Sequence, residues 1–320
     1  MKLVSYRSQS HTHLGILIEE DQIVDVNRLH DLYKERIPKD FILPNDMKQF
    51  IEQSESALPY VKALLNCYEE DYESKEISSC LISDAEVLAP LAQPEKIICV
   101  GLNYMDHCKE TNMEPPKSPV IFSKYANAII GDKAAIELPI NSNQVDFEAE
   151  LAIVIGKKAK CVSEAEAEDY IFGYTIMNDV SARDLQFSDG QWSRGKSADT
   201  FAPIGPVIVT KDEVGDPHKL DISLRLNGEI MQHSNTKNLI FKIPYIVSYL
   251  SQSMTLEPGD VIATGTPPGV GMGRDPQVWL KGGDVLSITI EKIGTLSNDV
   301  KGQSPYKMQN AQDNSLLASK

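Results

Sequence analysis

The chain has 320 residues, of which 42% are hydrophobic and 24% charged, so it can bury a substantial core and is not broadly disordered. Its 46 acidic and 31 basic residues give a net charge of −15. That balance disfavours a nucleic-acid partner and adsorption to anionic membranes, since both need clustered Lys and Arg. No apolar run approaches the roughly 20 residues of a membrane span, and the first residues become charged too early for a secretory signal. The five scattered cysteines are typical of free thiols, so we expect a cytoplasmic protein.

The first ninety residues predict a small α/β domain. Residues 14–18 and 22–26 are apolar runs on either side of an acidic turn, which indicates a β-hairpin. From residue 28 to residue 78 the apolar residues recur at helical spacing. Two prolines within residues 89–94 interrupt both helices and central strands. We therefore expect an N-terminal domain over residues 1–90.

The rest of the chain predicts a second, larger domain over residues 91–301, rich in short strands. Helical patterns are confined mainly to residues 164–170 and 243–251, so strands do not alternate with helices as in a doubly wound sheet. A β-rich α+β fold is favoured. Residues 302–320 are polar and aperiodic, which predicts a disordered tail. The clearest strands lie at residues 97–100, 149–155, 173–177, 206–210, 222–226, 261–263 and 285–290.

Three acidic residues alternate with apolar ones over residues 145–155. If this segment is one strand, its period of two places Asp146, Glu148 and Glu150 on one face. Carboxylates two residues apart repel each other unless a cation lies between them. The alternative is a solvated strand face that carries acids by chance.

A polar cluster follows the next strong strand, about thirty residues later. Asp179 lies where residues 173–177 end, a position from which a side chain can reach a cleft. It could equally be a helix cap, like its neighbours Asn178 and Ser181. Together with Glu148 and Glu150 it would complete a set of three carboxylates, which suits a hard cation such as Mg²⁺ or Mn²⁺.

A candidate base follows the strand at residues 97–100. Asn103 is a plausible N-cap of a short helix, on which His107 and Glu110 lie three residues apart on the same face. A carboxylate bound to one imidazole nitrogen orients the ring and raises its basicity, as a general base requires. Such a pair can also be an ordinary surface feature.

The glycine-rich residues 263–273 do not match a known phosphate loop. They lack the Gly-Lys-Ser/Thr ending of a P-loop, and the two prolines prevent a helix from following closely. They fit better a loop whose backbone amides and Thr266 hydroxyl hold a carboxylate. Three cations, Lys124, Arg183 and Lys196, lie in polar segments where a solvated surface is the simplest interpretation.

Taken together, these segments resemble the fumarylacetoacetate hydrolase family. The resemblance spans about 200 residues and implies a β-sandwich roll, a homodimer, and one Mg²⁺ or Mn²⁺ ion held by Glu148, Glu150 and Asp179. It is carried by six blocks in the family's order: Gly101-Leu102-Asn103-Tyr104 with His107 and Glu110, Phe122-Ser123-Lys124, residues 146–151, residues 178–186, Gly195-Lys196-Ser197 and residues 264–271.

The resemblance also implies roles for the remaining candidates. His107 with Glu110 would be the base pair, and Lys196 the catalytic lysine. Substrate oxygens would contact Arg183, Gln186 and Thr266, with Lys124 as a further substrate-binding residue. The chain departs from the family pattern after Lys124, where Tyr125 stands in place of the usual proline.

The expected function is metal-dependent carbon–carbon cleavage of a small 2-oxo or 1,3-dioxo acid. Hydrolysis of an acylpyruvate or fumarylpyruvate and decarboxylation of oxaloacetate both leave an enolate that a divalent cation and Lys196 can stabilise. Isomerisation of a 2-hydroxy-dienedioate is an alternative. The same carboxylates and lysine would also suit a metal-dependent phosphoesterase or nuclease, or a metal-dependent protein that binds organic acids without turnover.

Overall fold

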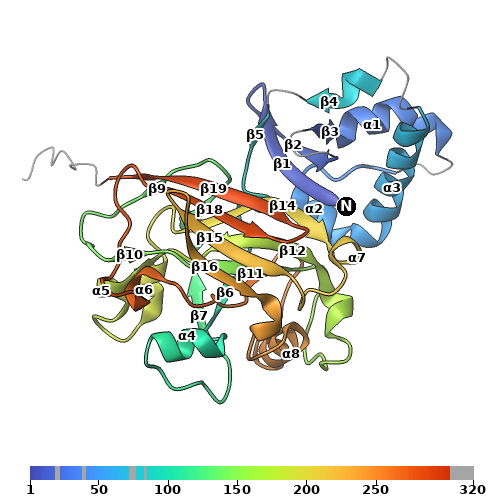
Figure 1. The fold of residues 1–320 in the computed structure, drawn as a ribbon. Coiled ribbons are helices and arrows are strands. Elements are labelled where there is room, and N and C mark those ends of the chain that lie inside the picture. The colour runs from blue at the N-terminus through green and yellow to red at the C-terminus, as the bar shows by residue number, and fades with distance from the viewer. Residues whose placement is uncertain (19–21, 38–40, 72–76, 83–84, 303–320) are drawn as a thin grey trace, which may run out of the picture.

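The computed structural model describes residues 1–18, 22–37, 41–71, 77–82 and 85–302. A small N-terminal part with three helices stands beside a larger part built mainly of strands (Figure 1). The predicted boundary near residue 90 falls between β5 (Glu86–Val87) and β6 (Ile97–Gly101) and stays a prediction. Of the predicted tail, residues 303–320 lie outside the described residues.

The N-terminal part combines a short antiparallel sheet with three helices. The predicted hairpin is confirmed, because β2 (His11–Leu17) pairs antiparallel with β3 (Ile23–Asp25). The helical pattern predicted from residue 28 to residue 78 is divided among the separate helices α1, α2 and α3. The longest, α3, buries Ala57, Val61, Leu64 and Tyr68 on one face, as its helical spacing predicts. Asp25 caps α1, since its carboxylate accepts a hydrogen bond from the Arg28 amide at 2.7 Å. The remaining elements are β1 (Lys2–Ser8), α1 (Val26–Tyr33), α2 (Met47–Glu52), α3 (Ser54–Glu70) and β4 (Leu81–Ile82).

A mixed sheet runs through both parts of the chain. Its strand order is β4-β3-β2-β1-β14-β12-β11-β17-β6-β7, so β1 joins the N-terminal strands to the larger part by pairing antiparallel with β14. The neighbours β17 and β6 are parallel, and β11 and β12 are buried along their whole lengths. Besides β6, the larger part contributes to this sheet β7 (Val120–Lys124), β8 (Ile129–Ile130), β11 (Ala149–Ile155), β12 (Ile171–Asn178), β14 (Ala202–Thr210) and β17 (Val261–Ala263).

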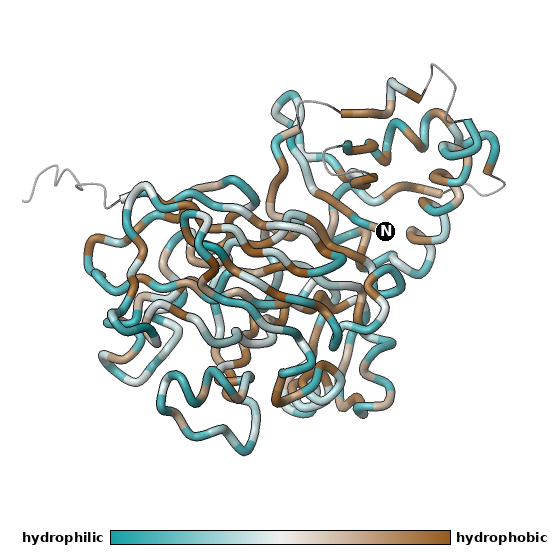
Figure 2. The backbone as a smooth tube through the Cα atoms, in the orientation of Figure 1, coloured by the Kyte–Doolittle hydropathy of each residue, from teal (hydrophilic) through white to brown (hydrophobic). Residues whose placement is uncertain are grey.

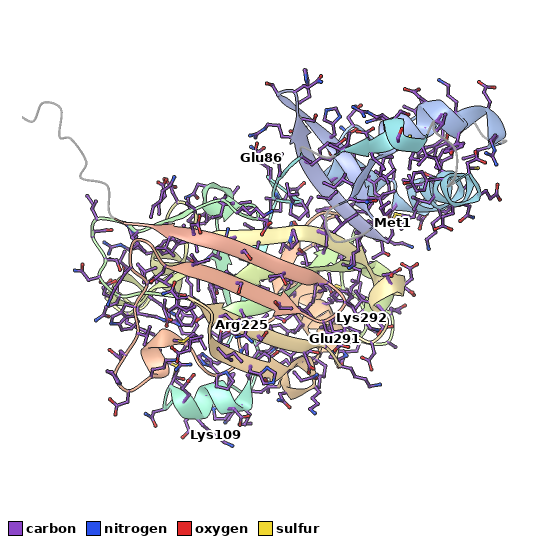
Figure 3. The ribbon with its side chains drawn as sticks, turned by 45° about the horizontal axis from the view of Figure 1, so that its top comes forward. Met1, Glu86, Lys109, Arg225, Glu291 and Lys292 are labelled. Carbon is purple, nitrogen blue, oxygen red and sulfur yellow. The ribbon has the colours of Figure 1, made fainter. Side chains whose placement is uncertain are left out.

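A second, five-stranded sheet packs against this one, with β15 beside β11 and β18 beside β12. The outward-facing residues of β15, Asp221, Ser223 and Arg225, are polar, and Arg225 lies on the outer face of this sheet (Figure 3). Both sheets are open, and apolar residues recur along their strands (Figure 2). The predicted β-rich α+β fold with packed sheets is therefore confirmed. The sheet contains β9 (Ile136–Glu137), β15 (Asp221–Leu226), β16 (Glu229–Asn235), β18 (Val285–Ile290) and β19 (Gly294–Lys301).

Two predicted elements differ from the structure. The helix expected at residues 164–170 is only a 3-10 turn at Ala167–Tyr170, with no side-chain N-cap. The single strand expected at residues 145–155 is divided into β10 (Val145–Asp146) and β11, and β10 pairs instead with β13 (Ser181–Ala182). The other helices are α4 (Met105–Glu110), α5 (Arg183–Gln186), α6 (Trp192–Lys196), α7 (Lys211–Val214) and α8 (Ile243–Ser253). Among the described residues, no helix combines the length and apolar character needed to cross a bilayer.

Candidate active site and metal centre

Three carboxylates converge where β11 begins and β12 ends. Ala149 pairs with Asn178, and the Asp179 amide donates to the Glu148 carbonyl at 2.9 Å, which brings the two chain segments together. One carboxylate oxygen from each of Glu148, Glu150 and Asp179 lies within 4.8 Å of the others, and all three residues are buried. The sequence grouped these three acids, and the structure places them side by side.

Asp146 does not join this group, although a continuous strand would have placed it on the same face. The break between β10 and β11 turns its side chain toward residues 271–272. Its carboxylate accepts from the Gly271 amide at 2.7 Å, the Met272 amide at 3.0 Å and Arg183 Nε at 2.9 Å. Asp146 therefore links the pocket arginine to the glycine-rich loop.

Three buried cations lie against the carboxylates. Lys196 Nζ is 2.8 Å from both a Glu148 and an Asp179 oxygen, and Arg183 Nη2 is 2.6 Å from the other Glu148 oxygen. Lys124 Nζ is 2.6 Å from Asp179. The side chain of Lys124 is fully buried behind Asp179 and does not line the pocket, unlike Arg183 and Lys196.

The charges of this cluster shift its pKa values in opposite directions. Burial acts to raise the pKa of Glu148, but the cations Lys196 and Arg183 outweigh it and hold that pKa below its ordinary value. Burial and the negative charges of Asp179 and Glu148 raise the pKa of Glu150 well above its ordinary range. Burial acts to lower the pKa of Lys196, yet the same two acids raise it, so Lys196 stays a cation at neutral pH.

His107 and Glu110 form the predicted pair on α4. His107 Nδ1 is 3.3 Å from one Glu110 oxygen, and the Gly269 amide donates to the other at 2.8 Å. Asn103 does not cap this helix, contrary to the expectation. Its side-chain amide donates to the carbonyls of Phe241 and Thr264 and accepts from the Phe241 amide, so it joins loops instead.

The glycine-rich loop does hold carboxylates, but they belong to the protein. The Gly265 amide donates to Glu150 and the Gly269 amide donates to Glu110. The amides of Gly271 and Met272 donate to Asp146. The donor–acceptor distances are 2.7–3.0 Å. A side chain at Gly271 would overlap the Val278 carbonyl, since an added Cβ would lie 1.9 Å from its oxygen. The loop therefore needs glycine there for its close packing.

These groups open into one pocket of about 410 Å³, its mouth included. His107, Glu148, Glu150, Arg183, Gln186, Lys196 and Thr266 line it. The pocket also has an apolar wall, which sequence reasoning missed and which includes Phe122 and Trp192. Their rings lie edge to face, with 5.5 Å between the ring centroids. Lys196 Nζ lies 4.9 Å from the centre of the Phe122 ring. The sequence signal for this wall was position: Phe122 begins the Phe-Ser-Lys block, and Trp192 lies shortly before the Gly-Lys-Ser block.

The residues present fit a divalent cation. Within the described residues Glu150 makes no ion pair, and its charge lies beside two other carboxylates. In the cluster, the four acids Asp146, Glu148, Glu150 and Asp179 outnumber the three cations by one. An all-oxygen donor set of this kind suits Mg²⁺ or Mn²⁺, and one such ion would reverse the sign of the net charge.

Comparison with known proteins identifies the family. Residues 96–301 match the family model described as fumarylacetoacetate (FAA) hydrolase C-terminal. This chain belongs to the fumarylacetoacetate hydrolase family. It is an enzyme, as the family and its similar proteins are.

One relative and two solved structures illustrate the similarity. A mitochondrial oxaloacetate tautomerase from Xenopus laevis is 44% identical over 94% of this chain and 90% of its own length. A fumarylacetoacetate hydrolase from Exiguobacterium antarcticum has a TM-score of 0.78 and 35% identity, covering 95% of this chain and all of its own. Maleylpyruvate hydrolase from Sphingobium sp. SYK-6, with manganese and pyruvate, has a TM-score of 0.74 and 30% identity, covering 95% of this chain and all of its own.

The expected cytoplasmic location is contradicted by the name of the Xenopus relative, which places that protein in mitochondria. The expectation depended on scattered free cysteines. Reduced thiols disfavour oxidising compartments but do not distinguish one reducing compartment from another.

Proposed function

We propose that this enzyme interconverts the keto and enol forms of oxaloacetate, with one Mg²⁺ or Mn²⁺ ion held by Glu148, Glu150 and Asp179. The observation that carries the proposal is the cluster of three carboxylates within 4.8 Å of one another, two of which, Glu148 and Glu150, line one pocket with His107, Arg183 and Lys196. The 44% identity to a protein named as an oxaloacetate tautomerase supports oxaloacetate as the substrate.

The charge of the pocket supports a dianionic substrate. With all four acids ionised, the cluster carries one excess negative charge, and the raised pKa of Glu150 shows how strongly its surroundings oppose that charge. A divalent ion would leave one excess positive charge, which favours a dianionic ligand. When bound, the ion supplies Lewis-acid stabilisation of the negative charge that develops on the keto oxygen.

His107 is the proposed proton carrier. Glu110 accepts a hydrogen bond from Nδ1–H, which keeps the ring proton on Nδ1 and leaves the lone pair of Nε2 free to accept a proton from substrate C3. The C3–H bond breaks, its electron pair forms the C2–C3 double bond, and the imidazolium returns a proton to the keto oxygen. The reverse sequence regenerates the ketone.

Lys196 is proposed to stabilise charge, and not to act as the base. Its raised pKa keeps it protonated, and its two ion pairs hold Nζ at the floor of the pocket. A fixed cation there favours the enolate over the neutral ketone.

Arg183 and Gln186 are proposed to bind a substrate carboxylate, with Thr266 contacting a further substrate oxygen. Arg183 Nη1 donates to Gln186 Oε1 at 3.0 Å, so the two side chains act as one surface of the pocket. Lys124 is proposed to support Asp179 from behind, because it does not reach the pocket.

Hydrolysis of an acylpyruvate is a second candidate, favoured by the same His107–Glu110 pair. An imidazole that can accept a proton from C3 can also accept one from water. The similar structure of maleylpyruvate hydrolase supports keeping this reaction in the test.

The deciding experiment is a substrate panel on protein stripped of metal and then reloaded with Mg²⁺ or Mn²⁺. Oxaloacetate would be followed by enol absorbance and by release of carbon dioxide, and acylpyruvate, fumarylpyruvate and maleylpyruvate by product formation. We expect rapid, metal-dependent interconversion of oxaloacetate. Metal-dependent hydrolysis with no acceleration of the oxaloacetate equilibrium would overturn the tautomerase proposal.

Two further properties are proposed from similarity alone. A mitochondrial location follows the name of the Xenopus relative, and cell fractionation tests it. A homodimer is what the family resemblance implies, and light scattering during size-exclusion chromatography tests it.

A further inference from the structure

The fully buried side-chain amide of Gln232 lies next to the pocket without lining it. Gln232 belongs to β16, at the edge of the second sheet, and pairs there with Leu224 of β15, but the hydrogen-bond partners of its side-chain amide lie outside that sheet. Its Oε1 accepts from the Ala149 amide at 2.9 Å, and its Nε2 donates to Thr266 Oγ1 at 2.8 Å and to the Pro267 carbonyl at 2.7 Å.

These contacts fix the orientation of the amide. The reversed orientation would set NH₂ against the Ala149 N–H and oxygen against the Pro267 carbonyl. Nε2 therefore faces Thr266 Oγ1, which must accept that bond, and the Thr266 proton goes to the Ala149 carbonyl at 3.0 Å. Ala149, Thr266 and Gln232 form a closed ring of hydrogen bonds.

The ring has a structural cause in the main sheet. β17 pairs with β11 only from Ala152 onward, so the backbone of Ala149 lacks a strand partner on that side. Gln232 and Thr266 supply the missing acceptor and donor from their side chains, because buried backbone groups need partners. Ala149 lies between two of the proposed metal ligands, Glu148 and Glu150.

We propose that Gln232 is a positioning residue of the pocket. It fixes the place of Thr266 Oγ1, and through Thr266 it acts on substrate binding without touching the substrate. The inference rests on the substrate contact assigned to Thr266 in the proposed function. A substrate oxygen that accepts a hydrogen bond from the Thr266 hydroxyl must compete with the Ala149 carbonyl for its proton. While the hydroxyl proton turns from one acceptor to the other, the bond from Gln232 keeps Thr266 Oγ1 in place.

The test uses full-length Gln232→Met, Thr266→Val, the double variant, and Thr236→Ala as a matched control. Thr236 is also fully buried, directly follows β16, and accepts from the Leu220 amide at 3.0 Å, but does not line the pocket. Two readouts are needed: KM for oxaloacetate, and Kd for pyruvate by calorimetry on the Mn²⁺-loaded protein, with Tm alongside.

We expect Gln232→Met to raise both constants about fivefold, the effect of losing roughly one hydrogen bond. Thr236→Ala should lower Tm but change neither constant by more than about twofold. In the Thr266→Val background, Gln232→Met should have less than a twofold further effect, since both changes act on one contact.

Two results would overturn the inference: constants within twofold of wild type in Gln232→Met, or the same fivefold factor with and without the Thr266 hydroxyl. If Gln232→Met does not fold, Gln232→Glu keeps the acceptor for Ala149 and removes the donor to Thr266, and the same thresholds apply. A wild type that binds pyruvate but leaves oxaloacetate unchanged overturns the proposed function alone, and pyruvate binding still decides the role of Gln232.

Discussion

Glu110 lies 3.3 Å from Nδ1 of His107 and is held there by the Gly269 amide, which binds its other oxygen. Glu110→Gln keeps the bond to Gly269 but turns an NH₂ group toward Nδ1. The ring must then carry its proton on Nε2, where it cannot accept another. We expect kcat to fall about 10²- to 10³-fold with little change in KM or Tm.

The control for that variant is Lys109→Gln on the same helix. Lys109 points away from the body of the protein (Figure 3), and 72% of its side chain is exposed. The Lys109→Gln variant should retain full activity. Glu110→Gln with kcat within threefold of wild type would rule out His107 as a base oriented by Glu110.

Glu150→Gln should separate metal binding from folding. The amide retains the bond from Gly265 and removes a charge beside two other carboxylates, so the metal-free variant should unfold at higher urea concentration than wild type. Mn²⁺ at 100 times its wild-type Kd should stabilise the wild type by about 2.7 kcal/mol and the variant far less. Equal metal-induced shifts in both proteins would remove Glu150 from the ligand set.

Asp146→Asn should weaken substrate binding through the loop and Arg183. The Asp146 carboxylate accepts from four donors, which are Arg183 Nε and the amides of Phe147, Gly271 and Met272; asparagine would turn an NH₂ group toward Arg183. We expect a loss of about 2–4 kcal/mol in unfolding free energy and a higher KM. Asp184→Asn is the control, because Asp184 binds Ser142 and Asn143 away from the pocket. It should leave KM unchanged; a matching rise in KM would refute a specific role for Asp146.

His218 makes stability depend on pH outside the active site. Burial and the charge of Lys242 lower its pKa, and its Nε2 accepts from the Ile243 amide at the start of α8 at 3.1 Å. Since the folded pKa of His218 lies below the unfolded value of about 6.5, the stabilisation that the neutral imidazole gives the folded state is complete above pH 6.5. It is lost as the pH falls through the folded pKa. Urea unfolding between pH 8 and pH 5 should show the loss, and His218→Gln, which keeps an acceptor, should reduce it. An unchanged pH slope in that variant would exclude His218.

The strands were predictable where the pattern is purely local. The strands expected at residues 261–263 and 285–290 match β17 and β18, and the expected helix at 243–251 matches α8 apart from its end. Glu148 and Glu150 could be paired because they lie two residues apart on one face of a predicted strand, and Asp179 could be added because it lies where another strong strand ends.

The failures share a physical cause. Asp146 fits the period of two of the predicted strand. In the structure its carboxylate binds the Gly271 and Met272 amides, which are distant along the chain, and the strand is divided between β10 and β11. Asn103 has the right side chain for an N-cap, yet partners in residues 241 and 264 bind it instead. The hydrogen bonds of Gln232 are equally non-local, so its sequence context gives no signal.

The antiparallel pairing of β1 with β14 has a practical consequence for anyone who shortens this protein. Lys2 and Leu3 sit opposite Val209 and Ile208, in a sheet that continues to β12 and β11. Deleting the first ninety residues would leave β14 with an uncovered hydrogen-bonding edge beside apolar side chains, a ready template for aggregation. A truncated enzyme should therefore precipitate even though every pocket residue is retained.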